Sequence, residues 1–365
     1  MNQPLAKVDS AQKLTIVDCD IHPTQRNPAD LHPFLEKKWV EHMQSFGPHF
    51  RQALVGQLPY PRMTANGMRV DTRPADGPAG SSLKMLQDQH LNPNGIQTGL
   101  LIALSRGGME ERNPDFAAAL SHASNEWQLA HFVDPEPRLR AGIVVAQDNP
   151  GAAAKEIEKR AGDRRFAQII MSSRAHDVPG SRTYWPIFAA AEANGIPIGL
   201  HPAGYSSGNP STGSGWPSFY FHEHYTFLPA AEGLVTSLIF EGVFAAFPKL
   251  KVAIIEGGFS WAPALGWRMD KAWETFRKEV PHVDRPPSEI MREHFRWATQ
   301  PIEEPENPRD LKDIIDWIGW DRLLYSSDYP HWDYDDPKHV FRFRLDDDQR
   351  AAIFGGNATA FYGLA

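Results

Sequence analysis

The stretch Leu14–His22, LTIVDCDIH, is a short apolar run that ends in two acidic residues and a histidine. Seven further runs of five to eight residues follow along the chain, and most of them are rich in Val, Ile or Leu. Continuous apolar runs of this length are typical of strands buried on both faces of a parallel sheet. We therefore expect strands at Leu14–Cys19, Thr98–Leu104, Leu139–Ala146, Phe166–Met171, Pro197–His201, Leu250–Glu256, Phe295–Thr299 and Leu323–Ser327.

Helical patterns separate these runs. Asn149 followed by Pro150 is typical of a helix start, and Gly195 of a helix end. Eight strands that alternate with helices predict an α/β fold, a (β/α)8 TIM barrel, whereas a doubly wound sheet needs a switch point and usually fewer strands. The expected helices are Asp115–Val133, Gly151–Ala161, Tyr184–Asn194, Pro229–Phe247, Trp261–Glu279, Asn307–Ile318 and Asp346–Phe354.

Two long segments interrupt the alternation. Asn27–Gln97 lies between the first two strands, and Ala203–His222 follows the fifth. Both leave the carboxyl ends of strands, which form the active-site face of a barrel, and long loops in compact domains are usually functional covers. We therefore expect one barrel domain over residues 1–365, with two insertions that cover its site.

Composition excludes several classes of protein. Hydrophobic residues make up 41% and charged residues 22%, which is typical of a folded globular chain. The net charge of −8 argues against nonspecific binding to nucleic acid or to an anionic membrane. Cys19 is the only cysteine, so an intrachain disulfide is impossible, and no signal-peptide pattern or long apolar span is visible. We expect a cytoplasmic protein.

Acidic residues and histidines gather where strands end. Within Asp18–His22 the two acids and the histidine alternate, so their side chains share one face of the strand. His201 and Glu256 end the fifth and sixth strands, and Asp328 follows the eighth. Because strand ends meet at one mouth of a barrel, this pattern predicts a divalent-metal site for Zn, Mn or Fe.

The motifs together resemble a known family. They are VDCDIHP at 17–23, GLHPAG at 199–204, SLIFEGVFAAFPKLKVAIIEGGFSWAP at 237–263 and YSSDYPHWD at 325–333. From about Val17 to Gly363 the chain resembles the amidohydrolase superfamily, in its amidohydrolase-related or aminocarboxymuconate-semialdehyde-decarboxylase-like branch. The resemblance implies a barrel that binds one divalent metal through Asp20, His22, His201 and Asp328.

The sequence departs from the commonest family pattern. Asp20 replaces the first histidine of a His-x-His motif, and Glu256 stands where a catalytic histidine is frequent. The fourth strand has no Lys or Glu at its tip, so the resemblance implies one metal rather than two bridged metals. A second metal stays open, with His224, Glu256 and His331 as extra candidate ligands.

Three reactions fit these residues. The main expectation is a metal-dependent hydrolase in which activated water attacks a carbonyl, Asp328 accepts a proton, and Glu256, His224 or His331 protonates the leaving group. The alternative is a non-oxidative decarboxylase of a small, aromatic carboxylic acid. A further alternative is an iron-dependent oxygenase, or its subunit, with two metals. A noncatalytic barrel paired with an active paralogue is the non-enzymatic alternative.

The expected partner is a small-molecule substrate. Arg174 follows the fourth strand and could bind a substrate carboxylate, and Trp216 in the second insertion is a further candidate contact. Aromatic residues expected outside the core, such as Trp267 and Phe276, favour a homodimer or a complex with a paralogous subunit. We expect the acidic run 333–336 to be solvated.

Overall fold

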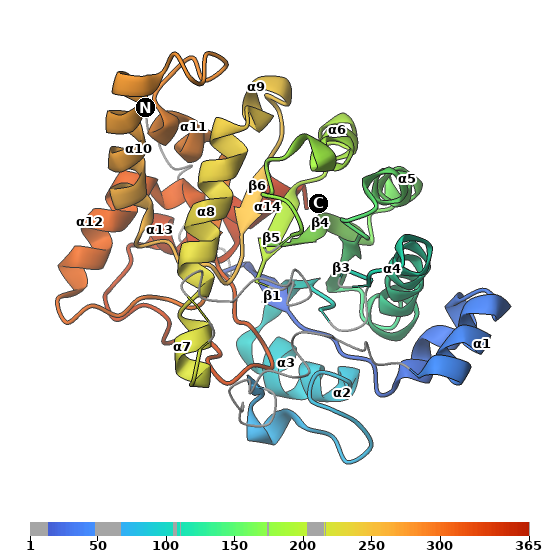
Figure 1. The fold of residues 1–365 in the computed structure, drawn as a ribbon. Helices are drawn as coiled ribbons and strands as arrows, with labels where there is room; N and C mark the ends of the chain where they lie inside the picture. The colour runs from blue at the N-terminus through green and yellow to red at the C-terminus, as the bar shows by residue number, and fades with distance from the viewer. Residues whose placement is uncertain are drawn as a thin grey trace.

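The computed structural model describes residues 14–47, 67–104, 108–109, 111–173, 175–202, 215 and 217–364. Eight strands form one sheet in chain order, and each pairs in parallel with the next. Helices surround the strands (Figure 1), so the predicted (β/α)8 barrel is confirmed. The strands are β1 (Ile16–Ile21), β2 (Ile96–Leu101), β3 (Leu139–Val144), β4 (Phe166–Ser172), β5 (Ile198–His201), β6 (Val252–Ile254), β7 (Phe295–Ala298) and β8 (Leu323–Leu324).

Backbone hydrogen bonds close the ring between β1 and the chain that follows β8. Cys19 N donates to Tyr325 O at 3.0 Å, and Asp328 N donates to Asp20 O at 3.1 Å. This closure holds the carboxyl ends of β1 and β8 side by side. It therefore brings Asp20 next to Asp328, although 307 residues separate them in the chain.

The apolar runs form strands because both of their faces are covered. All seven residues of β4 are buried, and the largest buried side chains include Trp297 and Phe295 of β7. The eighth strand is shorter than predicted. Side chains satisfy the backbone amides that follow it: Ser326 N donates to Thr299 Oγ1 at 3.1 Å and Ser327 N to an aspartate of β1. Those amides therefore do not take part in the backbone hydrogen bonds between strands.

Local signals account for several helix boundaries. Asn149 Oδ1 accepts from Ala152 N at the start of α5, and Gly195 ends α6 with a φ of 65°. The helix predicted over 229–247 is two helices, because Gly242 adopts a φ of 80° between α8 and α9. Outside the first insertion, the α-helices of the described residues are α4 (Pro114–Gln128), α5 (Pro150–Arg160), α6 (Trp185–Asn194), α7 (Tyr220–His224), α8 (Phe227–Phe240), α9 (Val243–Ala246), α10 (Ala262–Phe276), α11 (Pro287–His294), α12 (Pro308–Ile318), α13 (Asp347–Ala351) and α14 (Asn357–Tyr362).

The first insertion is folded where the structure describes it. It contains a 3-10 segment (Pro28–Phe34), α1 (Lys37–Phe46), α2 (Leu83–Leu86), a π-helical turn (Gln87–Leu91) and α3 (Asn92–Asn94). Most of the second insertion, 203–214 and residue 216, lies outside the described residues. None of the helices in the described part of the chain is long and apolar enough to cross a membrane.

Candidate metal centre

Four side chains from three strand ends converge at the mouth of the barrel. Asp20 belongs to β1 and His22 follows it, His201 ends β5, and Glu256 follows β6. One ligand atom from each lies within 4.8 Å of the others, and all four side chains are buried. The sequence predicts that side chains from these strand ends meet at the barrel mouth. In the structure, Glu256 lies as near to the other donors as Asp20, His22 and His201 do.

The two histidines present bare nitrogen lone pairs to the centre. His22 Nδ1 lies 3.0 Å from Ile102 O, and His201 Nδ1 lies 2.9 Å from Pro202 O. A carbonyl oxygen only accepts, so each Nδ1 carries the proton and each Nε2 is left with a lone pair. This is the arrangement that commonly orients a metal-binding histidine.

Carboxylate oxygens face these lone pairs. His22 Nε2 lies 3.0 Å from Asp20 Oδ1, and His201 Nε2 lies 2.8 Å from Glu256 Oε2. These contacts do not have hydrogen-bond geometry: both Nε2 atoms and both Asp20 oxygens are buried without a hydrogen-bond partner. Acceptors that face one another in a buried site repel unless a cation lies between them. Nitrogen and oxygen donors without sulfur fit a divalent cation such as Mn, Zn or Fe.

Without a metal, the electrostatics of the cluster favour protons on two of these side chains and keep a third neutral. Burial lowers the pKa of His201 to about 4, which keeps its imidazole neutral. Burial and the nearby charge of Asp328 raise the pKa of Glu256 well above its ordinary value. Burial also opposes a charge on His22, but the carboxylates of Asp20 and Asp328 outweigh it and raise the pKa of His22. Protons therefore compete with a metal for this cluster.

Asp328 borders the cluster and joins it to His331. Its Oδ1 lies 2.8 Å from His22 Nε2 and also makes a short hydrogen bond with His331 Nδ1, while Gln300 Nε2 donates to its Oδ2 at 3.1 Å. Burial would raise the pKa of Asp328, but the charge of His331, its hydrogen bond to Asp328 and the nearby His22 lower it. His22, Asp328 and His331 form a second group of metal-type donors.

Two site residues have strained backbones. Glu256 has a φ of 53° and Asp328 a φ of 61°, and no other non-glycine residue in the described ranges has a positive φ. Such conformations are costly for residues with a side chain and occur where function requires them. Glu256 follows the end of β6 by two residues and Asp328 follows the end of β8 by four, and both carboxylates lie at the barrel mouth.

Asp18 shares the predicted face but has a different role. Its oxygens accept from Ser327 N at 2.9 Å and Ser327 Oγ at 2.6 Å, and its Oδ2 lies 2.6 Å from His90 Nε2. It therefore ties β1 to the chain after β8 and stays outside the donor group. The roles of Ser327, His90 and Gln300 could not be found from the sequence, because their partners are distant in the chain.

The other predicted residues have mixed outcomes. His331 lies at the site, with its ring centroid 4.6 Å from that of His22. His224 belongs to neither donor group and instead lies 3.2 Å from Asp333. The acidic run 333–336 is partly buried, so the expectation of a solvated run is wrong: its side chains and backbone bond to the loops after β7 and β8. Arg174 and Trp216 lie outside the described residues.

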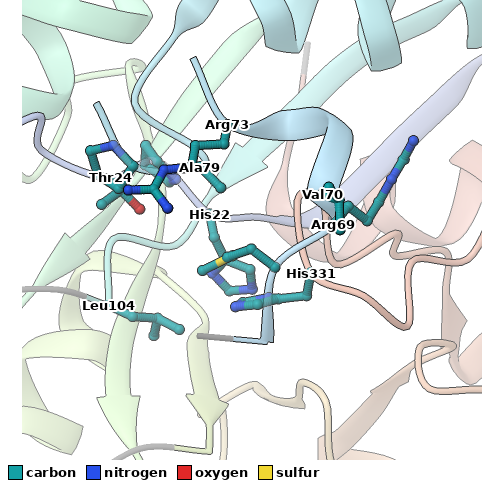
Figure 2. Close-up of a pocket in the computed structure, with 11 residues that line it drawn as sticks. His22, Thr24, Arg69, Val70, Arg73, Ala79, Leu104 and His331 are labelled. Atoms are coloured by element: carbon teal, nitrogen blue, oxygen red, sulfur yellow. The ribbon is translucent and has the colours of Figure 1, made fainter. Parts of the chain in front are cut away.

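A cavity of about 430 Å³ opens beside the cluster. His22 and His331 form one part of its wall, and most other lining residues are apolar or come from the first insertion (Figure 2). Its volume suits a small organic molecule. The lining residues are His22, Pro23, Thr24, Met68, Arg69, Val70, Arg73, Pro78, Ala79, Leu104 and His331.

The chain is similar to several known proteins in sequence and in fold. The chain is 26% identical over 295 residues to a gamma-resorcylate decarboxylase of Polaromonas sp. strain JS666, covering 76% of this chain and 86% of that protein. A 5-carboxyvanillate decarboxylase from Sphingomonas paucimobilis superposes with a TM-score of 0.66, at 19% identity, over 97% of this chain and all of that one. Another, from Novosphingobium aromaticivorans in complex with manganese, gives 0.72 at 17% identity, over 98% of each chain. The structural likenesses show the fold. The family model for amidohydrolases matches residues 17–364, which confirms that the chain is an enzyme and belongs to the amidohydrolase family.

Proposed function

We propose that this enzyme is a metal-dependent, non-oxidative decarboxylase of an aromatic carboxylic acid. The observation that carries the proposal is the buried cluster of unpaired acceptors that opens onto a small, mostly apolar cavity. The relatives support decarboxylation, because their names describe decarboxylases of aromatic acids. They favour this alternative over hydrolysis, which was the main expectation from the sequence.

Asp20, His22, His201 and Glu256 would hold the metal, with Asp328 as a bordering fifth candidate. Carboxylates and imidazoles suit manganese, and a structural neighbour contains manganese, so Mn²⁺ is the proposed ion. When bound, the metal supplies Lewis-acid polarisation of substrate oxygens and a fixed point for the substrate carboxylate.

One metal fits the donors better than two. The second donor group, His22, Asp328 and His331, shares His22 with the first. His22 Nδ1 is committed to Ile102 O, so this side chain has one lone pair to offer, at Nε2. The proposed site is therefore mononuclear, and the oxygenase alternative, which needs two metals, is disfavoured.

The protein itself supplies packing and a proton. Met68, Val70 and Leu104 give the cavity apolar walls against which an aromatic ring can pack and exclude water. Decarboxylation requires a proton on the ring carbon that loses carbon dioxide. The hydrogen-bonded pair of Asp328 and His331 holds a proton at the cavity wall, since Nδ1 of His331 bonds to Oδ1 of Asp328. We assign this pair the role of proton donor.

The proposal is tested with two substrate panels. Manganese-loaded protein is incubated with hydroxybenzoic acids and, separately, with aryl esters and amides, and carbon dioxide and products are quantified. The expected result is carbon dioxide and a phenol from at least one hydroxybenzoic acid, with loss of turnover in His331→Gln. Release of acid from esters or amides, without carbon dioxide from any acid, would show that the enzyme is a hydrolase.

Self-association remains a prediction. Trp267 and Phe276 on α10 are 60% and 64% exposed, which fits an uncovered apolar surface. A homodimer or a complex with a paralogous subunit would cover it. Light scattering at micromolar concentration should show a dimer of the chain alone, and a monomer would count against the homodimer.

A further inference from the structure

A second cavity, of about 390 Å³, lies at the face of the barrel opposite the metal centre. We call it the basal cavity, and the residues that line it include Lys249, Lys251, Glu293, Arg296 and Asp321. Lys251 directly precedes β6, and Arg296 is the second residue of β7. Because the strands are parallel, the basal cavity lies at their amino ends, whereas the metal centre lies at their carboxyl ends.

The acidic residues of the basal cavity already have basic partners. Glu293 pairs with Arg285 at an N–O distance of 2.5 Å, and Asp321 pairs with Arg322 at 3.3 Å. Neither of these arginines lines the cavity. Each carboxylate is therefore balanced by a cation from outside the cavity.

The basic residues of the basal cavity have no such balance. Lys249, Lys251 and Arg296 have no acidic partner in the described part of the chain, and Lys251 Nζ donates only to a carbonyl, Phe361 O, at 3.2 Å. Burial and the charge of Arg322 lower the pKa of Arg296 to about 10, which still leaves it charged at neutral pH. The cavity thus carries an excess of positive charge on a chain whose net charge is −8.

Arg296 presents an unoccupied edge to a ligand. Its Nη1 donates to Glu293 O at 3.2 Å and to Phe295 O at 2.9 Å, whereas its Nε and Nη2 make no hydrogen bond with any residue that the structure describes. The N–H bonds of Nε and Nη2 are parallel, and this edge of a guanidinium binds an oxyanion through two hydrogen bonds. The side chain is half-buried, so donors without acceptors are costly here.

One aromatic ring links the two cations. The ring of Phe361, which also lines the basal cavity, is centred 5.5 Å from the guanidinium carbon of Arg296 and 5.8 Å from Lys251 Nζ. Phe361 is buried, so its position is fixed by packing. Both cations therefore border the same rigid part of the cavity wall.

We propose that the basal cavity binds the phosphate group of a small phosphorylated molecule. Arg296 contacts two phosphate oxygens, and Lys251 balances the second negative charge. A phosphate monoester carries about two negative charges near neutral pH and three acceptor oxygens, so it matches several cations better than a single carboxylate does. The volume of the cavity leaves room for an organic group beside the phosphate. This site does not depend on the proposed reaction, which takes place at the other face.

Calorimetric titration with phenyl phosphate and with inorganic phosphate tests the proposal. Each titration is run in chelator and again with manganese-loaded protein, so that phosphate bound to the metal is recognised by its dependence on Mn²⁺. The variants are Arg296→Gln, Arg296→Lys and Lys251→Gln, with circular dichroism as the check on folding. Lys37→Gln, at an 89% exposed position on α1, and Arg309→Gln, at an 81% exposed position on α12, are the matched controls.

Wild type should bind phenyl phosphate at one site with or without Mn²⁺, and more tightly than inorganic phosphate. Arg296→Gln should raise the Kd by about 10- to 100-fold, the usual range for a charged hydrogen bond. Lys251→Gln should raise it by about 2- to 5-fold, as for an exposed ion pair. Arg296→Lys should lie between wild type and Arg296→Gln, and both controls should match wild type.

Two results would overturn the proposal. One is an affinity for phenyl phosphate that is the same in wild type, Arg296→Lys and Lys251→Gln, and this comparison holds even if Arg296→Gln does not fold. The other is no saturable binding by wild type together with a changed oligomeric state of Lys251→Gln in light scattering, which would assign the cations to a contact with a second copy of the chain.

Discussion

Metal removal should lower the thermal stability of the wild-type protein, and Asp20→Asn should abolish that effect. Both Asp20 oxygens and the Nε2 atoms of His22 and His201 are buried without hydrogen bonds, so these acceptors repel one another unless a cation or added protons lie between them. A ligand that binds only the folded state stabilises it by about 4 kcal/mol when its free concentration is about 1,000 times its Kd.

The size of the shift follows from the chain length. For 365 residues, an unfolding entropy of about 2.1 cal/mol/K per residue gives roughly 0.8 kcal/mol/K. A loss of about 4 kcal/mol therefore lowers the Tm by about 5 °C. In the metal-free state Asp20→Asn should unfold close to the wild-type temperature, because the cost of burying the Asp20 carboxylate and its attraction to a protonated His22 oppose one another.

Scanning calorimetry with excess chelator, and again after addition of Mn²⁺, measures both effects. Asp313→Asn, which changes a 66% exposed aspartate on α12, is the control and should respond to metal as wild type does. If Mn²⁺ raises the Tm of Asp20→Asn as much as that of wild type, Asp20 is not a ligand and the reasoning from unpaired acceptors fails.

Three further changes test other parts of the account. Glu256→Gln should lower the manganese content measured by elemental analysis and abolish turnover, because the carboxylate faces the metal centre; full metal content would assign it another role. Gly80→Ala should lower the free energy of unfolding by about 1–3 kcal/mol and raise KM, since its Cβ would meet His22 O. Gly47 has a similar φ of 82° but open space around it, so Gly47→Ala should leave KM unchanged. Burial opposes ionisation of Glu156, but its hydrogen bonds and an arginine partner outweigh it and lower its pKa to about 2. The pKa of Glu156 in the folded state lies below its unfolded value, so the stabilisation is present above pH 4.5 and is lost as the pH falls toward 2. Near neutrality, Glu156→Gln should lower the free energy of unfolding by about 3 kcal/mol. A difference between variant and wild type that stays constant from pH 7 to pH 2 would contradict the assignment.

Strand ends could be predicted from the sequence because burial on both faces leaves a continuous apolar signal. The barrel places those ends at one mouth, so Asp20, His22 and His201 could be brought together without coordinates. The same reasoning located Glu256, but not its 2.8 Å contact with His201, since the turn that allows it depends on an uncommon positive φ.

Contacts between distant segments could not be predicted. A period of two places Asp18 on the correct face, yet it cannot show that Ser327 and His90 occupy its oxygens. The segment 67–80 has no apolar periodicity, so its backbone contacts with the loops after β1 and β8 could not be inferred. The break at Gly242 was missed because the apolar pattern continues across it.

Isotope labelling tests the central claim most directly. Manganese-loaded enzyme is incubated in D2O with a hydroxybenzoic acid whose carboxylate carries carbon-13, and gas and product are followed by mass spectrometry and NMR. The account predicts labelled carbon dioxide, one deuterium at the vacated ring carbon, and loss of both signals when the metal is removed. Labelled carbon dioxide that forms equally well after chelation, or an acid that is recovered unaltered, would contradict it.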